Sequence, residues 1–332
     1  MNNTNGLNGN GFEIVSGRSN PELVKSVAKG LNVEPIFIDT KPWGNGYPRC
    51  IRPDDVTFLH KKVFIVTSLR YHELGSPVDE LELMFDACGS ASEIHIILTW
   101  FCTKDDISHN SGHTPTTTWI ANRIKNLGPK SVNCFDLHQS SHLEFFYPIR
   151  RRRFYFLRLL IENAKKLGIG QIAATDDSSS KRARKVEEFL KTNKPYIVAT
   201  KDHDHKSENS QVNFHKMSGE ILADKVCLFD DMALSLSTIK RSAESLKKMG
   251  VKEVYAAAPH FDPTSTTYEN LKECFENGWL TRFTTTNSNV IDEKFLGFGK
   301  DKFEVLDVSG FVSDVIRSII KGESTSSYFD DI

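Results

Sequence analysis

The sequence has almost no net charge and no long apolar run. Its 332 residues carry 42 Lys and Arg against 43 Asp and Glu, a formal net charge of −1. This balance argues against a nucleic-acid carrier and against a polybasic membrane binder. No run of about 18 apolar residues is present to span a membrane. Residues 1–10 are rich in Asn and Gly rather than apolar, so we expect a flexible tail over 1–11 rather than a signal peptide.

Two common binding signatures are also missing. There is no GxxxxGK[ST] sequence, which excludes a P-loop. The cysteines form no CxxC pair, so a structural zinc site is not expected. Their neighbours are mostly apolar, as in Val226-Cys227-Leu228, which is typical of reduced core cysteines and predicts a cytoplasmic protein. The chain has six of them: Cys50, Cys88, Cys102, Cys134, Cys227 and Cys274.

The remaining composition is that of a globular protein. Hydrophobic residues make up 39% and charged residues 26%, near the average for soluble domains, and the length suggests two domains. Apolar runs of strand length alternate with segments whose apolar residues recur at helical spacing. The runs predict strands at 12–15, 63–66, 94–98, 131–135, 171–174, 196–200, 226–229, 254–258 and 303–306. The helical spacing predicts helices at 21–31, 81–88, 154–167, 180–190, 268–275 and 312–320.

This alternation predicts an α/β fold built from mainly parallel sheets with helices on both faces. We expect a first domain over 12–150 and a second over 151–307. In open α/β sheets the ligand binds at the carboxyl ends of the strands. The residues that directly follow each predicted strand are therefore the candidates for a functional site.

An acidic pair gives the clearest candidate. Asp230 and Asp231 follow the predicted strand 226–229, and Ser235, Ser237 and Thr238 follow at the start of a helix. Adjacent carboxylates at that position can bind two vicinal hydroxyls of a sugar, and the helix start offers free N–H groups and a favourable dipole for phosphate. The alternative is a solvated acidic pair followed by an ordinary helix cap.

Other polar segments follow other strands. Asp176, after the strand 171–174, suits Mg²⁺ or a bridging water, whereas a turn with capping serines is the alternative. Asp136 and His138 follow the strand 131–135, where a histidine is either structural or part of a site. The long polar segment 101–113 is either a lid or a solvated loop. Arg150–Arg153, predicted to precede a helix, is either a solvated face or a phosphate-contact patch.

Five short motifs follow one another in a fixed order: Ser-Gly-Arg-Ser-Asn-Pro-Glu-Leu at 16–23, Asp-Ala-Cys-Gly-Ser-Ala-Ser at 86–92, Asp-Leu-His at 136–138, Asp176 with Lys-Arg-Ala at 181–183, and Asp-Asp-Met at 230–232. In this order and spacing they resemble the ribose-phosphate pyrophosphokinases, also called phosphoribosyl pyrophosphate synthetases. The resemblance covers nearly the whole chain after residue 11. It implies two phosphoribosyltransferase-like domains, with the final helix, 308–322, packed back on the first.

The resemblance also implies an activity. Members of the family transfer the diphosphoryl group of Mg-ATP to the C1 hydroxyl of ribose 5-phosphate, which gives phosphoribosyl pyrophosphate and AMP for nucleotide biosynthesis. It further implies an oligomer, formed with copies of the chain or with other family members. By position, the implied roles are a catalytic lysine at Lys201, Mg²⁺ ligands at Asp136, His138 and Asp176, ribose contacts at Asp230 and Asp231, and 5-phosphate contacts at Ser235, Ser237 and Thr238.

The chain departs from the family pattern in its loops. The sugar-phosphate loop of the family reads Asp-Asp-x-x-Asp-Thr-Gly-Gly-Thr, but here 234–237 reads Leu-Ser-Leu-Ser, without the acid or the glycines. Serines at 178 and 179 replace two further glycines, and the nucleotide-binding arginines have no counterpart in 103–108. Three hypotheses therefore stay open: an active synthetase, a catalytically inactive member that associates with and regulates active synthetases, and a diphosphotransferase for another ribose compound.

Overall fold

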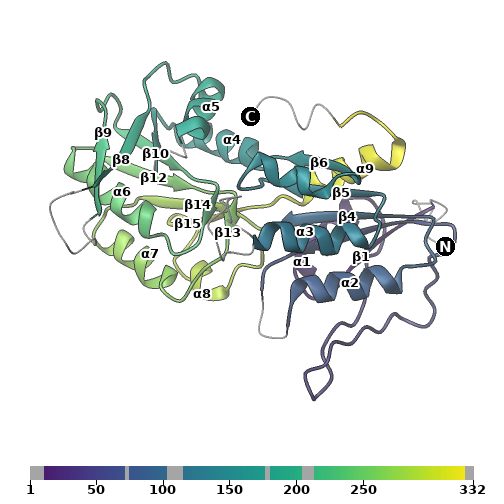
Figure 1. The fold of residues 1–332 in the computed structure, drawn as a ribbon. Coiled ribbons are helices and arrows are strands. Elements are labelled where there is room, and N and C mark those ends of the chain that lie inside the picture. Colours follow the sequence, from purple (N-terminus) through teal and green to yellow (C-terminus); the bar gives the residue numbers. More distant parts are fainter. Residues whose placement is uncertain (1–10, 72–74, 103–114, 176–179, 204–212, 326–332) are drawn as a thin grey trace, which may run out of the picture. The chain divides into compact units, whose positions relative to one another are not determined.

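The computed structural model describes residues 11–71, 75–102, 115–175, 180–203 and 213–325 (Figure 1). Within these ranges, the side chains of 181, 200–203 and 213–216 fall outside the description. The chain forms two compact units. Unit 1 takes in the chain up to Tyr155, the short segment Ser288–Val290 and the part that begins at Asp307, and unit 2 takes in Phe156–Asn287 and Ile291–Leu306.

A parallel sheet forms the centre of unit 1. Its six strands lie in the order β2-β1-β3-β4-β5-β6, and every neighbouring pair is parallel. Apart from β2 and β6 at the edges, the strands are almost entirely buried, as expected for a sheet covered on both faces. Their bounds are β1 Phe12–Ser16, β2 Ile36–Phe37, β3 Lys62–Ser68, β4 Glu93–Trp100, β5 Ser131–Phe135 and β6 Arg150–Phe154.

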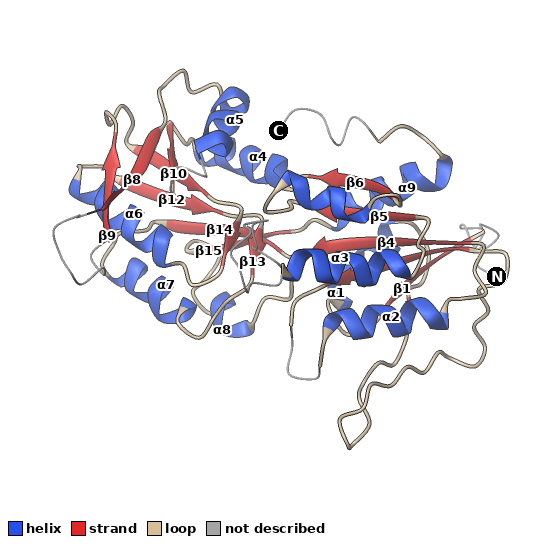
Figure 2. Ribbon diagram, viewed as in Figure 1, coloured by secondary structure: helices blue, strands red, loops and turns tan. Residues whose placement is uncertain are grey.

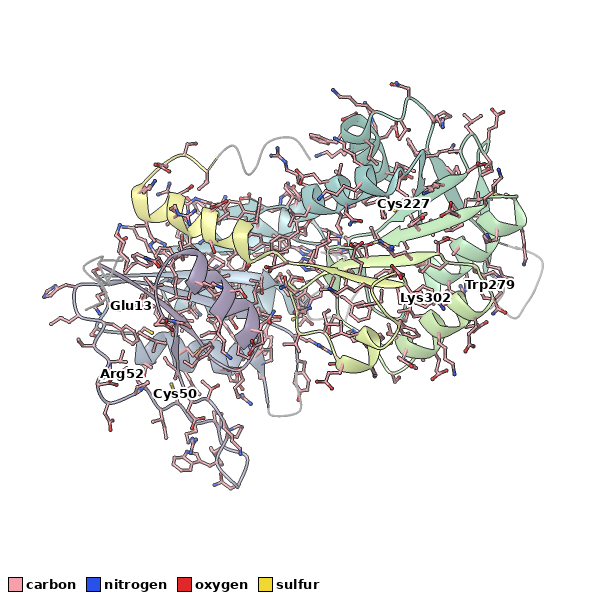
Figure 3. All side chains as sticks on the ribbon, turned by 180° about the vertical axis from the view of Figure 1, so that it is seen from behind. Glu13, Cys50, Arg52, Cys227, Trp279 and Lys302 are labelled. Atoms are coloured by element: carbon pink, nitrogen blue, oxygen red, sulfur yellow. The ribbon has the colours of Figure 1, made fainter. Side chains whose placement is uncertain are left out.

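Helices cover both faces of this sheet. Helices α2 and α3 pack on one face through Leu81, Met84 and Ile120, and α1 and α9 pack against each other on the opposite face (Figures 1 and 3). Gly30 lets α1 and α9 approach closely, because a Cβ at this residue would lie 2.5 Å from the Ser313 hydroxyl. The bounds are α1 Pro21–Gly30, α2 Pro77–Ala87, α3 Thr116–Asn126, the 3₁₀ helix η1 Ser140–Phe146 and α9 Ser309–Lys321.

Unit 2 contains a second mainly parallel sheet. Its seven strands lie in the order β15-β14-β12-β10-β7-β8-β9, and only β9 is antiparallel to its neighbour. The strand β10 is therefore central and lies between β7 and β12. The bounds are β7 Gln171–Ala174, β8 Ile197–His203, β9 Asn213–Ser218, β10 Lys225–Phe229, β12 Glu253–Ala257, β14 Arg282–Thr286 and β15 Phe303–Leu306.

The second sheet is also covered on both faces, and Figure 2 shows the blue helices α4 and α5 on one side of its red strands and α6 and α7 on the other. Helices α6 and α7 pack on the face to which Leu228 of β10 points, and Cys227 points to the opposite face (Figure 3). A small pair of strands, β11 Met232–Ala233 and β13 His260–Phe261, extends beyond the carboxyl edge. The helices are α4 Leu157–Leu167, α5 Ser180–Leu190, α6 Ser237–Lys248, α7 Thr267–Glu276 and α8 Glu293–Leu296.

The predicted fold class is confirmed: both units are mainly parallel sheets flanked by helices. One local prediction is wrong. The helix expected over 154–167 begins only at Leu157, as α4, and Arg150–Arg153 together with Phe154 forms the edge strand β6. The backbone of β6 pairs with that of β5 along its whole length. This pairing decides the conformation up to Phe154, although the apolar spacing predicts a helix from that residue. Within the described part of the chain, no helix is long and apolar enough to cross a membrane.

Candidate functional site

The acidic pair lies at the carboxyl end of the central strand of unit 2. Asp231 is buried and Asp230 is partly buried. The Thr175 hydroxyl, at the end of β7, donates to Asp230 Oδ2 at 3.1 Å, and the backbone N–H of Asp231 donates to Asp230 Oδ1 at 2.9 Å. Groups at the ends of the adjacent strands β7 and β10 thus hold the Asp230 carboxylate in one orientation. The pair is a rigid set of oxygen acceptors suited to neighbouring hydroxyl groups.

Two carboxylates this close repel one another, and the site contains a cation that reduces the repulsion. Burial, and then the charge of Asp231, raise the pKa of Asp230 above its ordinary value, while Arg182 acts in the opposite direction. Arg182 Nη1, on α5, lies 3.6 Å from Asp231 Oδ1. Arg182 therefore favours the charged state of the pair, which is the state that accepts hydroxyl hydrogen bonds.

A tight turn leads from the acidic pair to α6. Leu236 is the N-cap of α6 and has φ +59°, in the left-handed region, with its side chain buried. The hydroxyls of Ser235 and Ser237 lie 3.0 Å apart, and Thr238 follows in the first turn of the helix. Because Leu236 has no side-chain oxygen, it cannot cap the first-turn N–H groups. The Ser235 hydroxyl accepts from the Ser237 N–H at 3.4 Å, and the other first-turn N–H groups and the hydroxyls are donors of the kind that can bind an anion such as phosphate.

Helix α7 contacts this turn from the side, a contact that sequence reasoning missed. Thr267 donates its hydroxyl to the carbonyl of Leu234, and Asn270 Nδ2 donates to the carbonyl of Ser235 at 2.9 Å. About 30 residues separate donors and acceptors, so no local pattern could have revealed the contact. The predicted residues Asp230, Asp231, Ser235, Ser237 and Thr238 therefore lie together in one unit, with Thr175, Arg182, Thr267 and Asn270 added by the structure.

Asp136 and His138 lie in unit 1, at the carboxyl end of β5. Asp136 is buried with φ +41°, and its backbone N–H donates to the carbonyl of Phe154 at 2.9 Å. His138 is partly exposed. A carboxylate and an imidazole at a strand end are suitable donors for a divalent cation. Among the described residues, no three His, Cys, Asp or Glu side chains come together as a ready metal site.

Some predicted site residues lie outside the description. Asp176 is one, and so is most of the polar segment 101–113. Lys201 lies on β8, opposite His215 of β9 in the antiparallel register, but its side chain is not described. In the arginine run, Arg152 is buried and donates to Asn133 Oδ1 at 3.2 Å, so at least this member does not belong to a solvated face.

Known proteins are similar in sequence to this chain along almost its whole length. No family model matches the chain. The ribose-phosphate pyrophosphokinase of Chlorobaculum tepidum is 27% identical over 334 aligned residues, 96% of this chain and 95% of that protein. Ribose-phosphate pyrophosphokinase 2 of Schizosaccharomyces pombe is 26% identical over 96% of this chain and 98% of that protein.

A solved structure shows the same fold. Phosphoribosylpyrophosphate synthetase from Mycobacterium smegmatis matches with a TM-score of 0.82, covering 94% of this chain and 99% of that one, at 21% identity. This likeness and the two mainly parallel sheets are consistent with the expected fold of two phosphoribosyltransferase-like units. The curated relatives support the resemblance seen in the sequence, because the chain is similar to ribose-phosphate pyrophosphokinases along almost its whole length.

Proposed function

We propose that the protein is a ribose-phosphate pyrophosphokinase, which transfers the diphosphoryl group of ATP to the C1 hydroxyl of ribose 5-phosphate and releases AMP. The observation that carries the proposal is the acidic pair Asp230–Asp231 at the end of β10, followed by the start of α6, where the N-cap Leu236 makes no side-chain hydrogen bond. This order offers acceptors for hydroxyls next to donors for phosphate. The names of the curated relatives support the same activity.

In this proposal the two ends of the sugar phosphate are recognised by different chemistry. Asp230 and Asp231 accept hydrogen bonds from the two vicinal ribose hydroxyls. The 5-phosphate binds at the start of α6, with contacts from the hydroxyls of Ser235, Ser237 and Thr238 and from first-turn N–H groups. Holding both ends orients the C1 hydroxyl for attack, and such orientation supplies much of the rate enhancement in phosphoryl transfer.

The transfer step joins the C1 oxygen to the β-phosphorus of ATP. The bond from that phosphorus to the oxygen bridging to the α-phosphate breaks, AMP leaves with the electron pair, and the C1 hydroxyl releases its proton to water. Lys201 stabilises the charge on the transferring group. Asp136, His138 and Asp176 are each proposed as Mg²⁺ ligands, and the ion would neutralise phosphate charge. Oxygen and imidazole donors of this kind fit the ion.

The proposal extends to partners and location. We place the protein in the cytoplasm, because all six cysteines are free thiols and four of them are buried. ATP and ribose 5-phosphate are its substrates, and it forms oligomers with its own copies or with other family members. The alternative functions are a regulatory partner without activity and a diphosphotransferase for another ribose compound. No feature of the described residues favours either of them over the synthetase.

The test is to substitute the acidic pair and measure ribose 5-phosphate binding. We expect Asp231→Ala and Asp230→Asn to abolish measurable binding of ribose 5-phosphate by isothermal titration calorimetry, while a control variant, Asp301→Ala, whose side chain is fully exposed, binds like the wild type. Unchanged affinity in Asp231→Ala would show that the site lies elsewhere.

A further inference from the structure

The turn between β11 and α6 contains no glycine, although one of its residues has a left-handed backbone. A bulky residue keeps φ +59° only where its surroundings hold it there. The Leu236 side chain is buried in the core of unit 2, which fixes one side of the turn. The carbonyls of Leu234 and Ser235 are fixed from the other side by α7.

We propose that Asn270 and Thr267 of α7 are positioning residues for the phosphate-binding turn 234–237, because they hold the two carbonyls that set the direction of its free N–H groups. This inference rests on the proposed function and names residues outside the turn on which phosphate affinity depends. Neither side chain donates to the phosphate in this account. Both act through the backbone of the turn.

The planarity of the peptide bond provides the mechanism. In a trans peptide the C=O and the following N–H point in opposite directions. The carbonyl of Leu234 shares a peptide with the N–H of Ser235, and the carbonyl of Ser235 shares one with the N–H of Leu236. Because both carbonyls point toward α7, both N–H groups point away from it. Among the described residues neither N–H has a protein acceptor, so both are available to a ligand.

The orientation of the Asn270 amide is itself determined by its neighbours. Lys240 Nζ, on α6, donates to Asn270 Oδ1 at 3.2 Å and forms an ion pair with Glu273. An ammonium group can only donate, so the oxygen of the amide faces Lys240 and the nitrogen faces Ser235. Thr267 is fully buried and its hydroxyl oxygen also accepts from the backbone N–H of Thr264 at 2.8 Å. Its own proton is therefore directed to Leu234.

Three variants test the positioning role. Asn270→Ala removes the donor to the Ser235 carbonyl. Asn270→Asp keeps the shape of the side chain and its contact with Lys240, but it places an oxygen against the Ser235 carbonyl. Thr267→Val replaces the buried hydroxyl by a methyl group. Asn277→Ala, an exposed position at the end of the same helix, is the matched control. The measurements are the KM values for ribose 5-phosphate and for ATP, kcat, and the dissociation constants of ribose 5-phosphate and inorganic phosphate.

We expect each of the three variants to raise KM and Kd for ribose 5-phosphate about tenfold, the equivalent of about 1.4 kcal/mol, and to weaken phosphate binding likewise. The KM for ATP and kcat should stay within about twofold, and Asn277→Ala should match the wild type. Asn270→Ala is the decisive variant, since it removes the donor to the Ser235 carbonyl without adding a charge near the proposed phosphate site.

The outcomes separate this inference from the proposed function. If the wild type binds ribose 5-phosphate and Asn270→Ala binds it equally well, the positioning role is wrong and the proposed function stands. Equal losses in the KM values for ATP and for ribose 5-phosphate would also contradict the positioning role, because they indicate general loosening of the unit. If the folded wild type binds no ribose 5-phosphate, the proposed function and this inference are both overturned.

Discussion

Arg182 is a cation that lies 3.6 Å from the acidic pair, measured from its Nη1 to Asp231 Oδ1. Since it opposes the rise in the pKa of Asp230, its loss should let the pair take up a proton at higher pH. A protonated carboxyl has fewer acceptor sites for ribose hydroxyls. We therefore expect the arginine to extend the pH range in which the proposed site can bind its sugar toward lower pH.

We predict that Arg182→Gln raises the KM for ribose 5-phosphate and moves the acidic limb of the kcat/KM profile upward by about one pH unit. The KM effect should be largest below neutral pH, where the pair becomes protonated first. The measurement is the pH dependence of kcat/KM for ribose 5-phosphate. Arg184→Gln, an exposed position on the same helix, is the control, and identical profiles for Arg182→Gln and the wild type would contradict the role of the arginine.

A second residue with a defined pH effect is His95 in unit 1. Its ring stacks on Phe64 with 4.8 Å between the centroids, and Nδ1 lies 2.8 Å from the Ser131 hydroxyl. Burial lowers the pKa of His95 to about 4, with the charge of Arg152 acting in the same direction and Glu93 opposing it. In the unfolded chain the same group titrates near its ordinary value of about 6.5.

Stability should therefore decrease on acidification. Below pH 6.5 the unfolded chain takes up a proton at His95 that the folded chain accepts only near pH 4. The free energy of unfolding therefore decreases as the pH falls through that window. Between pH 7 and pH 5 the loss is about 2 kcal/mol. Urea denaturation of the wild type and of His95→Gln measures it. We expect the difference between the two to shrink as the pH falls, and a constant difference would be inconsistent with a neutral buried histidine.

At the scale of elements, α9 shows how the end of the chain stabilises unit 1. Its buried residues Val312, Val315 and Ile316 face the core, and the Ser313 hydroxyl donates to the carbonyl of Val27 on α1 at 3.0 Å. The helix ends with Gly322 in the left-handed conformation, a common helix stop. Unit 1 thus depends on a segment that follows the whole of unit 2 in the sequence.

We predict that Ile316→Ala lowers the free energy of unfolding by about 3 kcal/mol, the usual cost of truncating a fully buried isoleucine. Ile320→Ala, one turn further along the same helix and only partly buried, should cost less than half as much. Urea denaturation of the two variants gives the comparison. Equal costs would mean that α9 does not pack on unit 1 as described.

Two strands show where sequence reasoning reached its limit. In β6 the arginine run gives no apolar pattern, and pairing with β5 decides the conformation; charged side chains are common on such edge strands. In β14 the sequence Arg-Phe-Thr-Thr-Thr has one apolar residue, yet Thr284–Thr286 are buried. Two of the three hydroxyls form hydrogen bonds, Thr286 with the carbonyl of Pro259 at 2.7 Å and Thr284 with Glu304 Oε2 at 3.5 Å, whereas Thr285 Oγ1 has no partner among the described residues.

The whole molecule shows why the fold was easier to predict than the site. The alternation of buried strands and amphipathic helices runs through nearly the whole chain, and it is visible as apolar periodicity. The order of motifs placed Asp230 and Asp231 at a strand end, where the structure has them. Contacts such as that of Asn270 with the carbonyl of Ser235 arise only when α7 packs beside α6, so no spacing within the sequence could predict them.

The central claim is that this chain, despite a turn without glycine, still performs the family reaction. The most direct test incubates the purified full chain with Mg-ATP and ribose 5-phosphate and follows the products by phosphorus NMR. The account predicts equal amounts of AMP and phosphoribosyl pyrophosphate. Absence of both from a preparation shown to be folded, or formation of AMP without phosphoribosyl pyrophosphate, would contradict it.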